Sequence, residues 1–510
     1  MAENHNLNTL APSTQIKAQL AKLQQSGGDT PEMYQVWENY INALIVEDQP
    51  KEAAAQFAEL LASHDAAYDI KSSDAIPIRR RYARFLCHIG NTRAATTQFA
   101  TLQEALTHHL GPEDLETLYA QEQVGQCLNQ IGNVSAATQV FARVRTSRQR
   151  VQGKDHPDTL TSSAHYAVSL GKIGRHTEAL MECEALLPRM TTVWGADDER
   201  TIVMHGKRAL SLQALQRYDE AIEEYEQTIE SYYRVFGAEA PSTFKIRNQY
   251  AICLSNAGHD AEAVAQTAAL LDDARTVFGP HHPKTLRYWN SYAAGLANQK
   301  NLDESLAEFQ DLLATRLELY GETHPETRHT ILGYTKILEE LQRYEEAAQF
   351  YRILAEHEAE ATSDLALNTL KFRADYARNL LKFGDMLEAS VEFDKIRRGA
   401  RETLGETDKF HCYAWSQYAA TLICMEKYQA ALPEFEGLLR VSRDINGDDS
   451  LETIEVRYDY MRTLFALGKT AEAEVEYGEL LQDCTRIYGP NHSTTMHVQE
   501  FGAQFQPWDR

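Results

Sequence analysis

A fixed period of 42 residues runs through almost the whole chain and constrains the fold more than any other feature. A tyrosine recurs at this interval, as does a small residue that usually follows an acid, for example Tyr250 and Ala263. None of the series contains an insertion or a deletion, which predicts an array of equivalent structural repeats. The clearest marker is a glycine, replaced at Asp69 and Ser363, that stands at Gly27, Gly111, Gly153, Gly195, Gly237, Gly279, Gly321, Gly405, Gly447 and Gly489.

Each repeat is predicted to contain two helices. In residues 279–320, Pro283 suits the first turn of a helix, and apolar residues follow at helical spacing as far as Leu296. A polar break separates this helix from a second apolar helix, which ends before Gly321. One hairpin cannot bury its own apolar stripe, so successive hairpins are expected to stack. The predicted fold is therefore an all-α solenoid of about eleven antiparallel helix hairpins.

The segment between the two helices resembles the tetratricopeptide repeat (TPR). Its pattern is closest in QRYDEAIEEY at residues 216–225 and QRYEEAAQFY at residues 342–351. The period of 42 and linkers such as GPHHPKTL at residues 279–286 resemble the longer variant found in kinesin light chains. The resemblance covers about residues 27–510. It implies a right-handed superhelix whose first helices line a concave groove.

Three regions follow from the repeat register. Residues 1–26 precede it and are predicted to be a tail or a capping helix, residues 27–488 form the eleven-repeat solenoid, and residues 489–510 form a C-terminal capping helix. Within the solenoid, Pro188 and Pro433 fall inside second helices and are predicted to kink or shorten them.

The cellular location is predicted from three absences in the sequence. No apolar run approaches the length of a membrane-spanning helix, and the N-terminus lacks the features of a secretory signal. The seven cysteines are scattered, odd in number and without a CxxC motif, which indicates reduced core thiols. We therefore expect a cytoplasmic protein.

Charge is distributed unevenly between the helices of each repeat. The net charge of the chain is -24, which argues against a general binder of polyanions. The 14-residue cores of the eleven first helices nevertheless sum to +11, which leaves -35 for the rest of the chain. If the first helices line a groove, as the resemblance implies, that groove is basic inside an acidic shell.

Helical phase selects the side chains expected to face this groove. Arginine and lysine suit carboxylates or phosphates, and an asparagine amide can both donate to and accept from an extended peptide backbone. Asn248 and Asn290 stand where kinesin-light-chain-like repeats carry peptide-gripping asparagines. The predicted partner-binding residues are Arg80, Arg81, Arg84, Lys207, Lys245, Asn248, Arg287, Asn290, Lys336, Lys371, Arg378 and Arg462.

The sequence predicts no catalytic residues, no metal site and no cofactor. It contains no HExxH, GxSxG, Walker or GxGxxG motif, and its neighbouring histidines lack the i,i+4 spacing that places two ligands on one helix face. The recurring His-Pro pairs belong to the linker between repeats, so their periodicity has a structural explanation.

The favoured function is a protein–protein interaction scaffold or adaptor. Its basic groove would bind a protein or peptide partner that is acidic or has a free carboxylate. The alternative is a regulatory subunit or inhibitor that wraps a partner enzyme such as a protease or toxin. Nucleic acid is disfavoured because few aromatic residues accompany the basic run at residues 79–84 and the shell is acidic. The sequence leaves the oligomeric state open.

Overall fold

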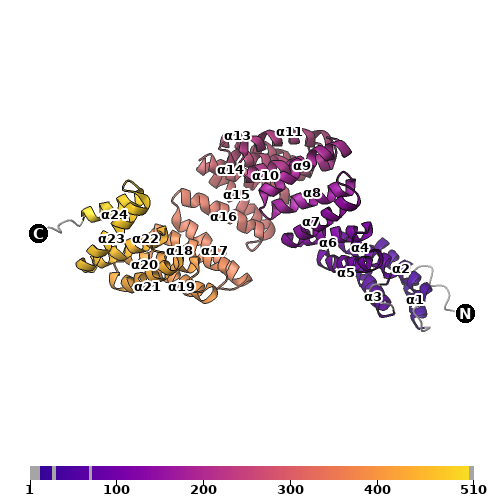
Figure 1. The fold of residues 1–510 in the computed structure, drawn as a ribbon, viewed down its shortest axis with the longest axis horizontal. Helices are drawn as coiled ribbons and strands as arrows, with labels where there is room; N and C mark the ends of the chain where they lie inside the picture. Colours follow the sequence, from indigo (N-terminus) through magenta and orange to yellow (C-terminus); the bar gives the residue numbers. More distant parts are fainter. Residues whose placement is uncertain (1–11, 26–29, 68–71, 505–510) are drawn as a thin grey trace. The chain divides into compact units, whose positions relative to one another are not determined.

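All regular structure in the described residues, 12–25, 30–67 and 72–504 of this computed structural model, is helical (Figure 1). The all-α solenoid prediction is therefore confirmed. The chain divides into two compact units, an N-terminal unit (Met1–Ala263) and a C-terminal unit (Val264–Arg510), whose boundary falls within α13 (Asp260–Phe278). The other helices of the N-terminal unit are α1 (Pro12–Gln25), α2 (Pro31–Val46), α3 (Pro50–Ala67), α4 (Ala75–His88), α5 (Thr92–Leu110), α6 (Leu115–Gln130), α7 (Val134–Val151), α8 (Pro157–Lys172), α9 (His176–Trp194), α10 (Glu199–Ala214), α11 (Tyr218–Phe236) and α12 (Pro241–Asn256).

The C-terminal unit continues the alternation of first and second helices. From α2 to α23 the helices form eleven pairs, one pair for each predicted repeat. The remaining helices of this unit are α14 (Pro283–Asn298), α15 (Leu302–Tyr320), α16 (Pro325–Glu340), α17 (Tyr344–Ala361), α18 (Leu367–Phe383), α19 (Met386–Leu404), α20 (Lys409–Cys424), α21 (Tyr428–Asn446), α22 (Leu451–Ala466), α23 (Thr470–Tyr488) and α24 (Ser493–Gln504).

The linker between repeats is a helix-capping device. In the linker before α14, the backbone N–H of Lys284 donates to His282 Nδ1 at 3.2 Å, and Pro283 occupies the first turn, where its missing N–H costs nothing. Thr285 Oγ1 donates to the carbonyl of Gly279 at 2.7 Å, and Gly279 has a φ of 91°, which favours glycine. These bonds give the His-Pro and threonine positions of the repeat a structural role.

The tyrosine and the acid of the repeat form a hydrogen bond across several of the hairpins. The hydroxyl of Tyr250 donates to Glu262 at 3.3 Å, and that of Tyr376 donates to Glu388 at 2.5 Å. The small residue that follows the acid is fully buried at Ser305, where the two helices of a hairpin approach closely. Its hydroxyl donates to the carbonyl of Ala293 at 2.8 Å.

A second hydrogen bond joins first and second helices between residues 19 positions apart. Trp37 Nε1 donates to Gln56 at 2.9 Å, and Trp415 Nε1 donates to Glu434 at 2.6 Å. At the corresponding position of the last complete hairpin, Arg457 donates to Glu476 at 2.6 Å. Different donors thus occupy one structural position, which the sequence analysis did not identify.

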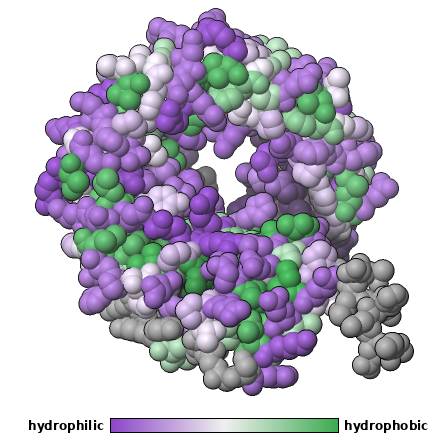
Figure 2. Space-filling model, turned by 90° about the vertical axis from the view of Figure 1, so that its right-hand side faces the viewer, coloured by the Kyte–Doolittle hydropathy of each residue, from purple (hydrophilic) through white to green (hydrophobic). Residues whose placement is uncertain are grey.

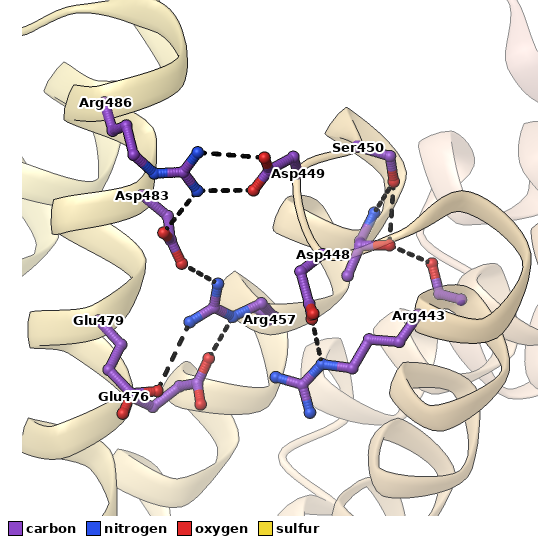
Figure 3. A network of polar contacts seen from close by, with 11 residues as sticks. Arg443, Asp448, Asp449, Ser450, Arg457, Glu476, Glu479, Asp483 and Arg486 are labelled. Carbon is purple, nitrogen blue, oxygen red and sulfur yellow. Dashed lines mark hydrogen bonds and ion pairs between the residues drawn. The ribbon is translucent and has the colours of Figure 1, made fainter.

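Arg457 also anchors a larger network that ties α22 to α23 (Figure 3). Its side chain is only 3% exposed and lies 2.8 Å from Asp483 and 3.9 Å from Glu479. Asp483 in turn pairs with Arg486, which reaches Asp449 at 2.6 Å. These hydrogen bonds hold the pKa of Asp483 below its usual value.

Pro188 and Pro433 were predicted to kink or shorten two second helices; the shortening is wrong, and the kink stays a prediction. Pro188 and Pro433 lie inside α9 and α21, and both helices are 19 residues long, as is α11. Both prolines are exposed, whereas neighbouring residues such as Leu187 and Met190 are buried. Packing of these neighbours maintains the helix despite the lost backbone hydrogen bond.

Helices lie at both ends of the repeat series. In α1, Leu20 is buried against the first hairpin, and the backbone N–H of Ser13 donates to Glu47 at 2.9 Å. At the other end, α24 buries Val498, and Thr495 repeats the threonine-to-glycine bond of the linkers. Residues 1–11, 26–29, which include the predicted marker Gly27, and 505–510 lie outside the described residues.

The surface seen in Figure 2 is mostly hydrophilic, with hydrophobic residues in separate small groups. Within the described residues, no helix combines the length and the apolar character needed to cross a membrane.

The prediction of core thiols holds only in part. Cys127, Cys183, Cys253 and Cys484 are buried, but Cys87 and Cys412 are half-buried and Cys424 is exposed.

Candidate functional site

The first helices of neighbouring hairpins touch one another within each unit. In the N-terminal unit α10 contacts both α8 and α12, and in the C-terminal unit α14 contacts α16 and α20 contacts α22. We refer to the surface formed by the first helices of one unit as its first-helix wall. All twelve predicted binding residues lie on first helices, six in each unit.

The basic run on α4 is largely neutralised by acids of the neighbouring first helices. Arg81 Nη1 lies 3.3 Å from Glu38 on α2, and Arg80 Nη2 lies 2.6 Å from Glu116 on α6. Arg84 is exposed and forms no ion pair within the described part of the chain. Of the three predicted arginines, only Arg84 is therefore available without breaking a contact.

Two of the predicted lysines come together in one cavity. Lys207 on α10 and Lys245 on α12 line a cavity of about 230 Å³, together with Lys172 at the end of α8. We call this cavity the lysine pocket. Among the described residues neither Lys207 nor Lys245 has an ion-pair partner, while Lys172 Nζ donates to Asn129 Oδ1 at 3.0 Å.

The pocket disfavours the positive charge that it contains. Burial lowers the pKa of Lys207, and the nearby charges of Lys245 and Lys172 lower that pKa further. Part of the wall is apolar, with Val168 and Leu210 among its residues. The electrostatic repulsion between the three ammonium groups is thus strengthened by limited contact with water. A bound anion would offset both the burial of the Lys207 charge and the repulsion between the three ammonium groups.

The two predicted asparagines, one in each unit, both have an unsatisfied side-chain oxygen. Asn248 lies on α12 of the N-terminal unit and Asn290 on α14 of the C-terminal unit. The side-chain Oδ1 of each is shielded from solvent and accepts no hydrogen bond from the described residues. Each residue as a whole is half-buried. Their amides therefore retain unused hydrogen-bonding capacity at the wall. Arg287, also on α14, lies 3.8 Å from Glu326.

Two predicted arginines of the C-terminal unit, Arg378 and Arg462, are paired on their own helices. Arg378 lies 2.8 Å from Asp375, and Arg462 lies 2.9 Å from Asp459, each acid being three residues earlier. Arg378 also lies 3.6 Å from Glu339 of the preceding first helix. These arginines compensate buried acids, since burial raises the pKa of both Asp375 and Asp459.

Lys336 and Lys371 complete the predicted set in the C-terminal unit. Both are exposed, Lys336 on α16 and Lys371 on α18, and neither forms an ion pair within residues 264–504. The structure does not gather them into a cavity with other predicted residues. The basic stripe read from the sequence therefore consists of paired arginines, scattered lysines and one pocket.

A second cavity, of about 360 Å³, lies against α20, α21 and α22 in the C-terminal unit. Glu452 and Glu455 line it, along with Lys409, Tyr413 and Gln417, and we call it the acidic pocket because its acids outnumber its one lysine. Burial raises the pKa of Glu455, and repulsion from Glu452 and Asp459 raises it further. Sequence reasoning about a basic groove did not anticipate this pocket.

A buried polar cluster was also missed. Glu122 on α6 lies 3.0 Å from Arg148, 3.1 Å from His165 Nδ1, and accepts a hydrogen bond from Ser162 at 2.8 Å. It stands at the same repeat position as Asn248, which is the signal that could have revealed it. Because these contacts satisfy the carboxylate, the cluster links α6, α7 and α8.

Metal-binding side chains do not gather in the part of the chain that the structure describes. Within it, no group of three or more His, Cys, Asp or Glu residues is arranged to hold an ion. The residues of the lysine pocket are instead suited to an anionic group, because ammonium groups are donors without an acceptor.

The sequence profiles of one protein family match the chain. Tetratricopeptide repeat profiles match residues 200–267, 284–352 and 462–494. These segments carry the hairpins described above, and they confirm the resemblance seen in the sequence. No curated protein matches the chain.

Several solved structures are similar to the chain in architecture. Kinesin light chain TPR-like repeats from Podosopora anserina are 19% identical, with a TM-score of 0.37, over 40% of this chain and 96% of that one. BtubC (BKLC) from P. vanneervenii is 11% identical, with a TM-score of 0.35, over 48% of this chain and 93% of that one. Human IFIT1, in a dimer with m7Gppp-AAAA, is 14% identical, with a TM-score of 0.46, over 89% of this chain and 94% of that one. At these levels the likenesses concern the all-helical repeat architecture alone.

Proposed function

Because the chain carries tetratricopeptide repeats, we propose that it is a non-catalytic adaptor whose N-terminal first-helix wall binds an acidic peptide segment of a protein partner. Tetratricopeptide repeats support a role as a protein-interaction scaffold. The chemistry of the wall supports the acidic character of the partner, because its unpaired groups are cationic or amide.

The observation that carries this proposal is the lysine pocket. Lys207 and Lys245 are brought together from two hairpins without an acid to compensate them. Asn248 lies on the same helix as Lys245 and has an unsatisfied side-chain oxygen. The proposal assigns carboxylates of the partner to the lysines and to Arg84, and the partner's backbone to Asn248.

The remaining predicted residues receive a smaller role in the proposal. Arg80, Arg81, Arg287, Arg378 and Arg462 already face acids of this chain, so a partner would have to compete for them. The pairs of Arg80, Arg81 and Arg287 are partly exposed, so competition for these three arginines costs about 0–1 kcal/mol for each pair. These arginines would widen the binding surface without deciding specificity.

The proposal is tested by binding to a peptide array in which the number of Asp and Glu residues varies. The variant Lys245→Ala/Asn248→Ala is compared with Lys154→Ala/Asn256→Ala, which removes the same groups from exposed positions of the same unit. We expect acidic peptides to bind the wild type, the wall variant to lose at least tenfold in affinity, and the control to stay within twofold.

Two results would overturn the proposal. Acidic peptides could fail to bind the wild type, or they could bind both double variants equally well. Inhibition of a folded partner enzyme, with more than about 2,000 Å² of buried surface and no sensitivity to the wall variant, would instead favour a wrapping regulatory subunit.

A further inference from the structure

The lysine pocket concentrates positive charge in an acidic chain. The chain has 74 acidic residues and a net charge of -24, yet no Asp or Glu lines the pocket. Its three lysines come from three different first helices, so the tertiary structure assembles the charge. Elsewhere on the first-helix walls, Arg81, Arg378 and Arg462 each have an acid within 3.3 Å.

The side chains of the pocket suit an oxyanion with more than one negative charge. A single carboxylate would neutralise one of the three ammonium groups, whereas a dianion neutralises two. The pocket contains no arginine, so it cannot offer the planar fork that pairs with a carboxylate through two parallel hydrogen bonds. Lysine binds phosphate as a point charge, which does not require that geometry.

Further polar groups in the pocket can contact such a ligand. His176 Nδ1 is shielded from solvent and has no hydrogen-bond partner within the described residues. The side-chain amide of Gln249 also lines the pocket and can donate to an anion, whereas the Ser211 hydroxyl already donates to the Lys207 carbonyl at 3.0 Å. A water molecule occupies about 30 Å³ in the liquid, so about 230 Å³ leaves room for a tetrahedral phosphate and several waters.

We propose that the lysine pocket is a subsite for a phosphate dianion carried by the peptide partner, that is, for a phosphorylated serine, threonine or tyrosine side chain. This inference rests on the proposed function and adds a chemical selectivity to it. Apolar groups such as Val168 and Leu210 limit the access of water, which strengthens the attraction between lysines and phosphate. Phosphorylation of a partner would then control its capture by this chain.

The test measures calorimetric binding of one acidic peptide in three forms: unmodified, phosphorylated, and with glutamate at the phosphorylation position. Inorganic phosphate is titrated in parallel, and all titrations use the full chain at pH 7.5 and constant ionic strength. We expect the phosphorylated peptide to bind at least tenfold more tightly than the other two forms. The preference should decline by pH 5.5, because the second pKa of a phosphate monoester is about 6.

The variant Lys207→Met removes one charge from the pocket and keeps most of the length of the side chain. We expect it to reduce the preference for phosphate to less than threefold. The matched control Lys154→Met removes an exposed lysine of the same unit and should retain the preference. Lys207→Met should fold, because it replaces an uncompensated charge with an apolar group.

The outcomes separate this inference from the proposed function. Equal affinity for the three peptide forms would overturn the phosphate subsite and leave the acidic-peptide adaptor intact. Loss of the preference in both lysine variants would indicate general charge screening and would also overturn the subsite. Saturation by inorganic phosphate, with no preference for the phosphorylated peptide, would assign the pocket to free phosphate and overturn the role of the partner. Failure of every peptide to bind would overturn the proposed function itself.

Discussion

The lysine pocket and the acidic pocket place opposite charges at equivalent positions of the repeat. Lys245 and Glu455 are 210 residues apart, which is five repeats, and each lines its own pocket. Like charges crowd both sites: the pKa of Lys207 is lowered and that of Glu455 is raised, in each case by burial first and by like-charged neighbours second. The repeat therefore fixes where a side chain stands, while its charge is free to vary.

A second comparison shows how each unit treats a buried charge. Lys207 corresponds to Asp375 four repeats later and to Asp459 six repeats later. Both acids have an arginine three residues on, whereas the N-terminal unit has Leu210 at that position. The charges of Asp375 and Asp459 are thus neutralised on their own helices, whereas the charge of Lys207 is left open to a ligand.

The largest effect is expected from a substitution that removes a buried arginine from its acidic partners in the C-terminal unit. Arg457→Met should destabilise the α22–α23 hairpin by about 3 kcal/mol, because it leaves Glu476 and Asp483 without their buried partner. Hydrogen exchange of the amides in these two helices is the appropriate measurement, since repeats can open locally.

Arg443→Met is the matched control for this change. Arg443 also pairs with an acid, Asp448 at 2.7 Å, but both side chains are largely exposed. Its loss should change the same exchange free energies by less than about 0.5 kcal/mol. Equal effects of the two substitutions would show that burial of Arg457 does not determine the strength of the network.

A smaller effect is expected at the self-paired acid. Arg378→Met should cost about 1 kcal/mol, because Asp375 keeps its burial and loses its partner. Adding Asp375→Asn should recover most of this loss. A double-mutant cycle by chemical denaturation measures the coupling. If the two changes are simply additive, Arg378 and Asp375 do not stabilise each other, and Arg378 is free to bind a partner. The contrast between the paired Asp375 and the unpaired Lys207 would then disappear.

The substitution Leu210→Glu transfers the C-terminal arrangement to the N-terminal unit. It gives Lys207 an acid three residues away, an interaction of about 0.2–0.5 kcal/mol on a helix surface. We expect a small change in melting temperature and a loss of at least tenfold in affinity for acidic or phosphorylated peptides. Leu210→Gln supplies the control with similar size and no charge. Unchanged affinity in the glutamate variant would contradict the view that Lys207 must remain unpaired.

The smallest effect is a pH dependence. Burial and neighbouring lysines lower the pKa of Lys207 in the folded state below its ordinary value of 10.5. At any pH below that folded-state pKa, Lys207 is charged in both the folded and the unfolded state, and the charge destabilises the folded state to its full extent. This destabilisation disappears as pH rises from the folded-state pKa towards 10.5. Lys207→Met should therefore be more stable than the wild type at pH 7, and this advantage should shrink as pH rises towards 10.5. Melting curves across this range provide the measurement, and a difference that does not depend on pH would show that Lys207 is not the cause.

Several features of the fold followed directly from residue spacing. The Gly279 turn, the Pro283 start of α14 and the buried Ser305 all lie where the 42-residue register predicted structural markers. Such features depend on contacts within one hairpin and its linker, so a short sequence window contains both partners. The lengths of the two proline-containing helices were misjudged because burial of neighbouring residues, a tertiary property, outweighs the local preference of proline.

Only part of the candidate site could be predicted from the sequence. Helical phase selected Lys207 and Lys245, but Lys172 lies outside that phase, at the end of α8, and reaches the same cavity. The pairing of Arg81 with Glu38 joins residues 43 positions apart, on neighbouring first helices. No local pattern distinguishes a paired arginine from a free lysine.

The sequence by itself determined the repeat, its helical hairpins and its resemblance to tetratricopeptide repeats, because each depends on regular spacing of apolar, small and capping residues. The tertiary structure decided which charges are neutralised and which are left open. Electrostatic pairing depends on distances of about 3–4 Å between side chains of different hairpins, and only the stacking of those hairpins sets such distances. Stacking therefore produced a cationic pocket in one unit and an acidic pocket in the other from one repeated frame.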